Sequence, residues 1–71
     1  LHKTIEIEVR GLRVVVALDI EPDEENPTAT LTATAADGSQ LAKVRVRPDH
    51  GLTRASAQRW ADAGYPRASE D

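Results

Sequence analysis

The sequence contains no cysteine, methionine or phenylalanine, and its aromatic residues are one tryptophan and one tyrosine. Without cysteine, neither a disulfide nor a thiolate metal site can stabilise the fold. The apolar side chains are also small, because 11 are alanine and only 15 are valine, isoleucine or leucine. A single core at this chain length contributes about 3–5 kcal/mol of stability. We therefore expect the domain to bury surface against a second chain, as a homodimer or with a protein partner.

Long apolar runs are absent too. The longest stretch without a formal charge, Asn26–Ala36, is rich in threonine and too short to span a bilayer. Charged residues interrupt the first apolar positions, so no signal peptide is predicted. These absences favour a cytoplasmic protein without membrane contact.

Charge is unevenly distributed along the chain. The formal net charge is −3, with −5 in residues 1–39 and +4 in residues 40–67. An acidic chain is not a general binder of polyanions. The basic second half nevertheless leaves nucleic-acid binding open as an alternative.

Two hairpins are predicted from the alternation of apolar and polar residues with a period of two. The first joins residues 3–9 to residues 12–20 through Arg10-Gly11, a pair suited to a tight turn. An acidic, proline-containing loop follows at residues 21–27. The second hairpin joins residues 28–36 to residues 41–47, with Asp37-Gly38 as a two-residue turn signal.

A helix is predicted over residues 52–63, with the Thr53 hydroxyl as its cap. Gly64 and Pro66 follow as signals for its end. Its apolar stripe is predicted from helical spacing to be Leu52, Ala55 or Ser56, Trp60 and Ala63. The fold class is thus α+β: a four-stranded antiparallel meander followed by one helix packed on the sheet. Residues 1–66 are expected to form one domain and residues 67–71 a disordered tail.

No residue pattern indicates an enzyme. Asp49-His50-Gly51 is typical of a turn, and no further ligands accompany it in the sequence. The four glycines each lie at an expected element boundary, where turn geometry explains them. We therefore predict no catalytic residue, metal or cofactor, and no small-molecule substrate is evident.

One sheet face carries the candidate binding residues. Alternation places threonines of residues 28–36 beside basic residues of 41–47, and we call the predicted set the Thr/Arg face: Arg13, Thr30, Thr32, Thr34, Lys43, Arg45 and Arg47. Such a face can meet phosphate or an acidic partner. It can equally be a solvated face with ion pairs to Glu6 and Glu8. In a simple meander those glutamates would be remote from the basic strand, which would then be freer to bind.

Strand edges offer a second mode of association. Lysine and arginine at an edge deter aggregation, or the edge can pair with another strand. The leading interpretation is a small non-enzymatic protein-interaction module that associates with itself or a partner through a sheet edge or the Thr/Arg face. The composition, with much alanine and arginine and little lysine, is typical of GC-rich bacteria and their phages, so a phage or mobile-element accessory role is expected.

DNA binding through residues 40–47 and the helix at 52–63 is the alternative, with Arg54 and Arg59 added to the basic strand. The segment Arg59–Pro66 resembles the end of the recognition helix in excisionase-type and MerR-type winged helices. That family has a helix before this one, whereas residues 41–47 are predicted here as strand. Residues 28–64 also resemble the dimerisation domain of actinobacterial nucleoid-bridging silencers, which implies dimerisation through the sheet.

Overall fold

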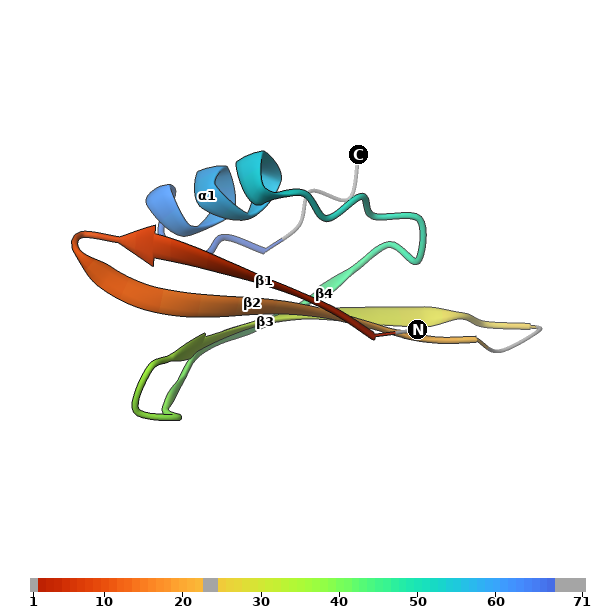
Figure 1. The fold of residues 1–71 in the computed structure, drawn as a ribbon. Coiled ribbons are helices and arrows are strands. Elements are labelled where there is room, and N and C mark those ends of the chain that lie inside the picture. Colours follow the sequence, from red (N-terminus) through yellow and green to blue (C-terminus); the bar gives the residue numbers. More distant parts are fainter. Residues whose placement is uncertain (1, 23–24, 68–71) are drawn as a thin grey trace.

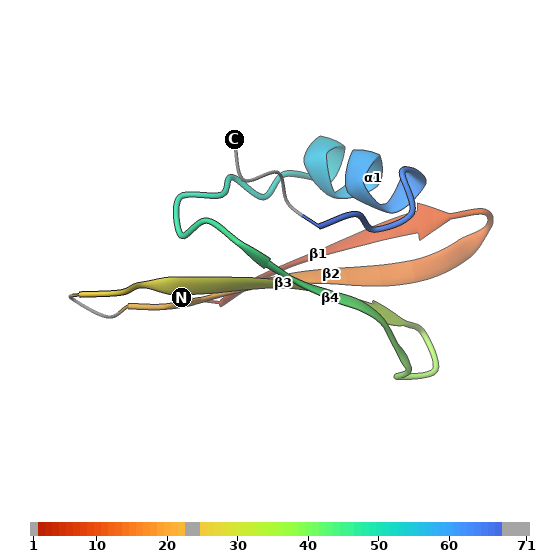
Figure 2. The same cartoon turned by 180° about the vertical axis from the view of Figure 1, so that it is seen from behind.

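The computed structural model describes residues 2–22 and 25–67. Its elements are, in chain order, β1 (His2–Val9), β2 (Leu12–Glu21), β3 (Thr28–Ala35), β4 (Gln40–Val46) and α1 (Arg54–Asp62). All strands are antiparallel and lie in the order β1-β2-β3-β4, with the helix on one side of the sheet at its β1 end (Figure 1). The predicted α+β meander with a C-terminal helix is confirmed. The opposite side of the sheet has no covering layer in the described chain (Figure 2).

The core lies between the helix and the facing side of the sheet. Its sheet residues occupy alternate positions along the strands, and Val16 and Leu31 are buried at the centre. The buried set is Ile7, Val14, Val16, Leu18, Ala29, Leu31, Ala33, Val46, Leu52, Ala57 and Ala61. At the β4 end, Ala42 and Val44 pack against this core but stay partly exposed. The apolar layer therefore reaches beyond the part that the helix covers.

The helix has the predicted cap, but it is shorter than the predicted 52–63 and buries a partly different stripe. Thr53 caps it, and the Thr53 and Ser56 side chains form reciprocal bonds with each other's main-chain N–H groups. Ala57 and Ala61, four residues apart, are the buried positions, whereas Ala55 and Ala63 are exposed. Of the predicted stripe, Leu52 is buried and Trp60 packs against the core. Ala55 and Ala63 were wrong, because the helix starts at Arg54 and turns Ala57 and Ala61 to the sheet.

Trp60 lies at the side of the helix and is only partly buried. Its indole Nε1 donates to the carbonyl of Pro66 at 2.7 Å, and its ring meets Tyr65 edge-to-face at 5.0 Å between centroids. Trp60 thus packs against the core and also holds the segment after the helix back onto the helix. Gly64, with φ of 88°, ends the helix as predicted.

The two hairpin turns differ. Arg10 and Gly11 both have positive φ, 52° and 78°, as a two-residue turn of type I′ requires. The second connection has four residues, the number that the predicted strand bounds leave, and it contains the predicted turn signal Asp37-Gly38. It occupies Ala36–Ser39, closed by a bond from Ala35 N–H to the Ser39 carbonyl at 2.8 Å. The Asp37 carboxylate accepts bonds from Ser39, and this local bonding favours the wider loop.

Two leucines at the turn end of the sheet are exposed. Leu12, which strand alternation places on the same face as the buried Val14, is 70% exposed, and Leu41 is 46% exposed. A register shift between Ala33 and Thr34 interrupts the β3–β4 pairing beside Leu41. Both leucines lie where the helix no longer covers the sheet, and they line a pocket described below. Within the described residues, no helix has the length and hydropathy needed to cross a membrane.

Candidate functional site

The free edge of β1 is closed by side chains of the helix. The Arg54 guanidinium donates to the Glu6 carbonyl at 2.8 Å, and the Gln58 amide donates to the Glu8 carbonyl at 3.0 Å. Lys3 of β1 donates in return to the Leu52 carbonyl at 2.7 Å. Main-chain carbonyls that would otherwise receive another strand thus have partners already. We call this arrangement the β1 clasp.

The opposite edge, along β4, has no such cover from the residues that the structure describes. Residues in an antiparallel sheet bond alternately to one neighbouring strand and to the other. The Glu6 and Glu8 carbonyls point away from β2. When the same alternation is followed through the paired residues of β2, β3 and β4, the main-chain N–H and C=O groups of Lys43 and Arg45 point away from β3. In residues 2–22 and 25–67, no side chain hydrogen-bonds to the main chain of β4, and we call this strand the open edge.

The Thr/Arg face forms on the uncovered side of the sheet. Thr30 is paired with Arg45 and Thr32 with Lys43, so the basic side chains of β4 have threonine as their neighbours. Glu6 and Glu8 lie on β1, at the far edge, as a simple meander requires. Among the described residues, Lys43 and Arg45 take part in no ion pair. They are therefore two exposed cations without local neutralisation.

Other members of the predicted binding set lie elsewhere. Arg13 is on β2, where its Nε is 3.7 Å from the Glu6 carboxylate of β1, so it lies on the β1 side of the sheet and not beside β4. Arg54 and Arg59 are on the helix, on the other side of the sheet from Lys43. Arg54 is engaged in the β1 clasp. Arg47 follows β4 and is exposed, with an interaction of its own. The basic residues therefore do not converge on one surface.

Sequence reasoning missed the β1 clasp. Arg54 was considered only as a phosphate-binding cation, and Gln58 was not considered. The available signal was their spacing of four residues, which places both on one face of a helix. That signal does not reveal which strand lies beside the helix.

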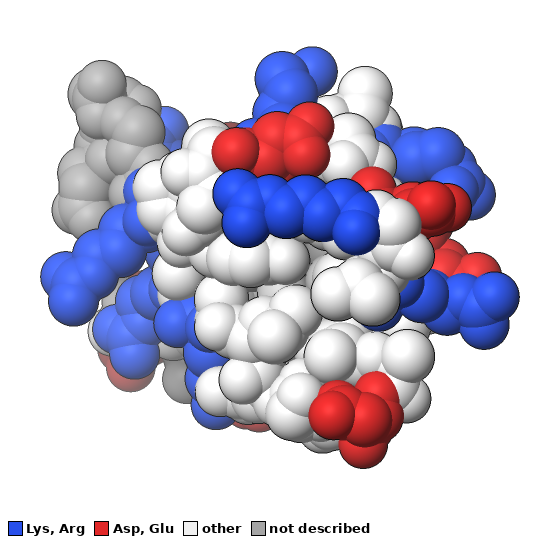
Figure 3. Space-filling view, turned by 90° about the vertical axis from the view of Figure 1, so that its left-hand side faces the viewer, with Lys and Arg blue, Asp and Glu red and all other residues white. Residues whose placement is uncertain are grey.

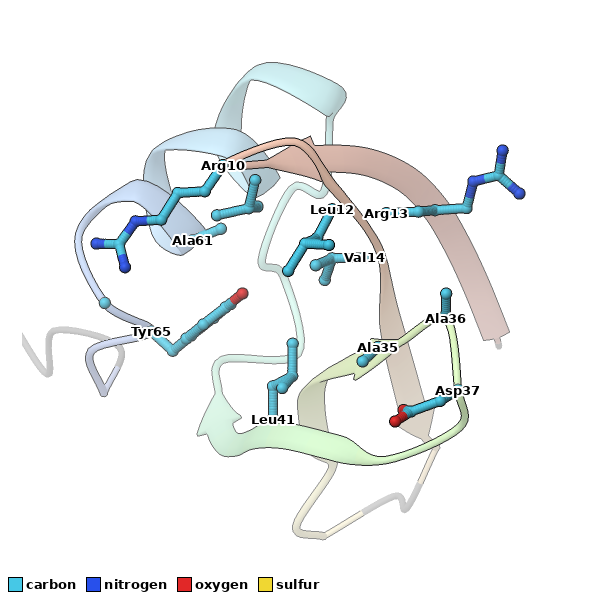
Figure 4. A pocket seen from close by; sticks show the side chains of 12 residues that line it. Arg10, Leu12, Arg13, Val14, Ala35, Ala36, Asp37, Leu41, Ala61 and Tyr65 are labelled. Atoms are coloured by element: carbon cyan, nitrogen blue, oxygen red, sulfur yellow. The ribbon is translucent and has the colours of Figure 1, made fainter.

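An apolar pocket of about 490 Å³ opens at the turn end of the molecule. Leu12, Leu41 and Tyr65 point into it from β2, β4 and the segment after the helix, while the guanidinium of Arg13 points away (Figure 4). Viewed from this end, an uncharged surface is bordered by Lys and Arg side chains and by some Asp and Glu side chains (Figure 3). Because Leu41 belongs to both the pocket and β4, the pocket adjoins the open edge. The sequence analysis did not predict this pocket.

The titratable groups offer little chemistry. His2 and Asp19 form an exposed pair on the uncovered sheet face. No group of three or more His, Asp or Glu suited to a metal ion occurs among the described residues. Bonds from the Ser39 hydroxyl and main-chain N–H lower the pKa of Asp37 below its usual value. This effect belongs to the β3–β4 turn.

No protein-family model, curated protein or solved structure matches the chain.

Proposed function

We propose that this chain is a small non-enzymatic protein-interaction module that receives a strand of a protein partner along β4. The observation that carries the proposal is the difference between its two sheet edges. The β1 clasp occupies one edge, whereas β4 keeps outward main-chain groups at Lys43 and Arg45. Addition of a strand to an exposed edge is a common way for a sheet to bind an extended peptide.

The partly exposed core residues of β4 support this proposal. Ala42 and Val44 face the helix side of the sheet, pack against the core, and retain exposure. A fifth strand would cover them at the same time as it bonds to the open edge. It would also reach the pocket at Leu41. Such burial would add the apolar area in which this small core is poor.

A peptide titration tests the proposal. The probe is a blocked synthetic peptide with the sequence of residues 4–9, Thr-Ile-Glu-Ile-Glu-Val, which alternates as a strand requires. We expect it to shift the NMR amide signals of Lys43 and Arg45 in the isotope-labelled protein. We expect no comparable shift along β1, because its edge carbonyls are occupied. A chain that binds no alternating peptide at β4 would contradict the proposal.

A proline substitution isolates the main-chain contribution. Arg45→Pro removes an outward N–H, while the β3–β4 bonds at Val44 and Val46 remain. Arg45→Ala is the matched control, because it removes the same side chain and keeps the N–H. We expect peptide binding to persist in Arg45→Ala and to be lost in Arg45→Pro, with both variants retaining the dispersed spectrum of the folded protein. Equal binding by the two variants would show that strand addition is not the mode.

DNA binding is the alternative that the same preparation can test. Its predicted residues are divided between the two sides of the sheet, and no observed feature favours it. If it occurred, binding to random duplex DNA would weaken steeply between about 50 and about 200 mM salt, with a log–log slope near −0.9 for each phosphate neutralised. The cytoplasmic location and the phage or mobile-element role stay predictions.

A further inference from the structure

We infer that the strand received by β4 carries acidic side chains at alternate positions, opposite Lys43 and Arg45, with apolar side chains between them. This inference rests on the proposed function and names the chemistry of its partner. It starts from the two sides of β4. Lys43 and Arg45 are exposed on the uncovered face, and Ala42 and Val44 lie on the helix side.

The positions opposite Lys43 and Arg45 are fixed by the outward main-chain groups. A strand that bonds to those groups places its own residues directly across from them, with side chains on the same face. Two residues across from Lys43 and Arg45 are therefore two apart in the partner. Because neither cation has an acidic neighbour on β3, carboxylates at both positions would complete two cross-strand pairs.

The residues between those acids must be apolar for a separate reason. They would point to the helix side, beside Ala42 and Val44, and extend the core there. At the turn end of β4 the next apolar side chain would lie beside Leu41, at the mouth of the pocket. The partner pattern is thus apolar, acid, apolar, acid, apolar.

A second copy of this chain fits the open edge less well. Antiparallel pairing of β4 with another β4 would bring Lys43 and Arg45 of both copies together, and like charges directly opposite are destabilising. The strand in this chain with the required pattern is β1, in which Glu6 and Glu8 alternate with Ile5, Ile7 and Val9. In a folded copy, the β1 clasp occupies the outward carbonyls of that strand, so they are not available to pair with β4. The charge complementarity therefore favours an acidic strand of a different protein.

Three peptides of equal length test the charge pattern. They are the blocked probe Thr-Ile-Glu-Ile-Glu-Val and its versions with both Glu replaced by Gln or by Lys. We expect the acidic peptide to bind roughly 2- to 30-fold more tightly than the Gln peptide, from two cross-strand charge pairs. The Lys peptide should bind more weakly than the Gln peptide. The readout is the dissociation constant from the amide shifts of Lys43 and Arg45.

Charge reversal supplies the control. In the variant Lys43→Glu with Arg45→Glu, the preference should change to the Lys peptide. The variant Arg59→Glu with Arg67→Glu alters the net charge equally at residues outside β4, and it should keep the preference for the acidic peptide. A preference that changes equally in both variants would overturn the inference, because it would reflect net charge alone.

The outcomes separate this inference from the proposed function. Equal binding of all three peptides at β4 would overturn the acidic pattern and leave strand addition standing. Binding of none would overturn both. If the protein alone protects the Lys43 and Arg45 amides from hydrogen exchange in a concentration-dependent way, the partner is a second copy and the inference of a foreign acidic strand is overturned.

Discussion

The guanidinium of Arg54 donates a hydrogen bond of 2.8 Å to the main-chain carbonyl of Glu6, at the free edge of β1. The helix therefore contacts this strand in two ways. Its alanines pack on the face of the sheet, and its long polar side chains reach over the edge. The first contact contributes to the core, and the second removes an edge at which other chains can pair.

Removal of the β1 clasp should expose that edge. For Arg54→Ala and Gln58→Ala we expect a loss of about 0.5–1.5 kcal/mol each in the free energy of unfolding, as is usual for a lost hydrogen bond. The double variant should also associate with itself more than the original chain. Urea denaturation and sedimentation velocity measure the two effects. Arg59→Ala, an exposed change on the same helix, should alter neither. A double variant that stays as monomeric as the original would contradict an edge-protecting role.

A larger residue at Ala57 should separate the helix from the sheet. Ala57 is 1% exposed and close to the sheet, so Ala57→Leu should lower the free energy of unfolding by about 1–3 kcal/mol through overpacking. Ala55→Leu, an exposed change on the same helix, should stay within about 0.5 kcal/mol of the original. Denaturant titration compares them. Equal effects at the two positions would mean that the buried stripe is misassigned.

The first hairpin turn should become more stable when Arg10 is replaced by a residue that adopts positive φ more readily. Arg10 has φ of 52°, a conformation that costs most side chains about 1–2 kcal/mol. Asparagine adopts this conformation readily, and Asn-Gly is the preferred type I′ pair. We expect Arg10→Asn to raise the melting temperature and Gly11→Ala to lower it, because Gly11 has φ of 78°. A fall in melting temperature for Arg10→Asn would show that the arginine side chain contributes more than the turn strain costs.

The Asp37 carboxyl should titrate at a lower pH in the folded protein than in the unfolded chain. The Ser39 hydroxyl, at 2.6 Å, is the main cause of the lowered pKa, and the Ser39 N–H adds to it. A lowered folded pKa means that its stabilising contribution is present above the usual value of 3.8 and is lost as the pH falls through the folded pKa. In Ser39→Ala we expect the pKa to rise towards the usual value, and in Ser39→Thr to stay low. Carboxyl NMR titration measures both, and an identical pKa in the two variants would exclude the hydroxyl as the cause.

The sheet was predictable because alternation is a property of neighbouring residues. Ile5, Ile7 and Val9 in one run, and Val14, Val16 and Leu18 in the next, report their common face directly. The Arg10-Gly11 turn was predictable for the same local reason. Both signals are contained in a few consecutive residues.

The helix face and the open edge were not predictable, because they depend on distant partners. Helical spacing predicted Ala55 or Ser56, and Ala63, for the core beside Leu52 and Trp60. The position of β1 selects Ala57 and Ala61 instead of the alanines predicted. Arg54 and Gln58 donate to main-chain carbonyls of β1, and every residue has such a carbonyl, so the sequence does not indicate which one is the acceptor. The register shift between Ala33 and Thr34, beside Leu41, was not predictable either, because no glycine or proline at these residues indicates it.

The β1 clasp also limits how far a sheet built from this chain can grow. A fibre that grows strand by strand needs both edges of every unit, one to receive the previous unit and one to receive the next. A unit with one accepting edge ends such a series wherever it joins. If β4 receives a strand as proposed, this fold would act as a chain terminator, because the β1 clasp leaves no second edge from which polymerisation can continue.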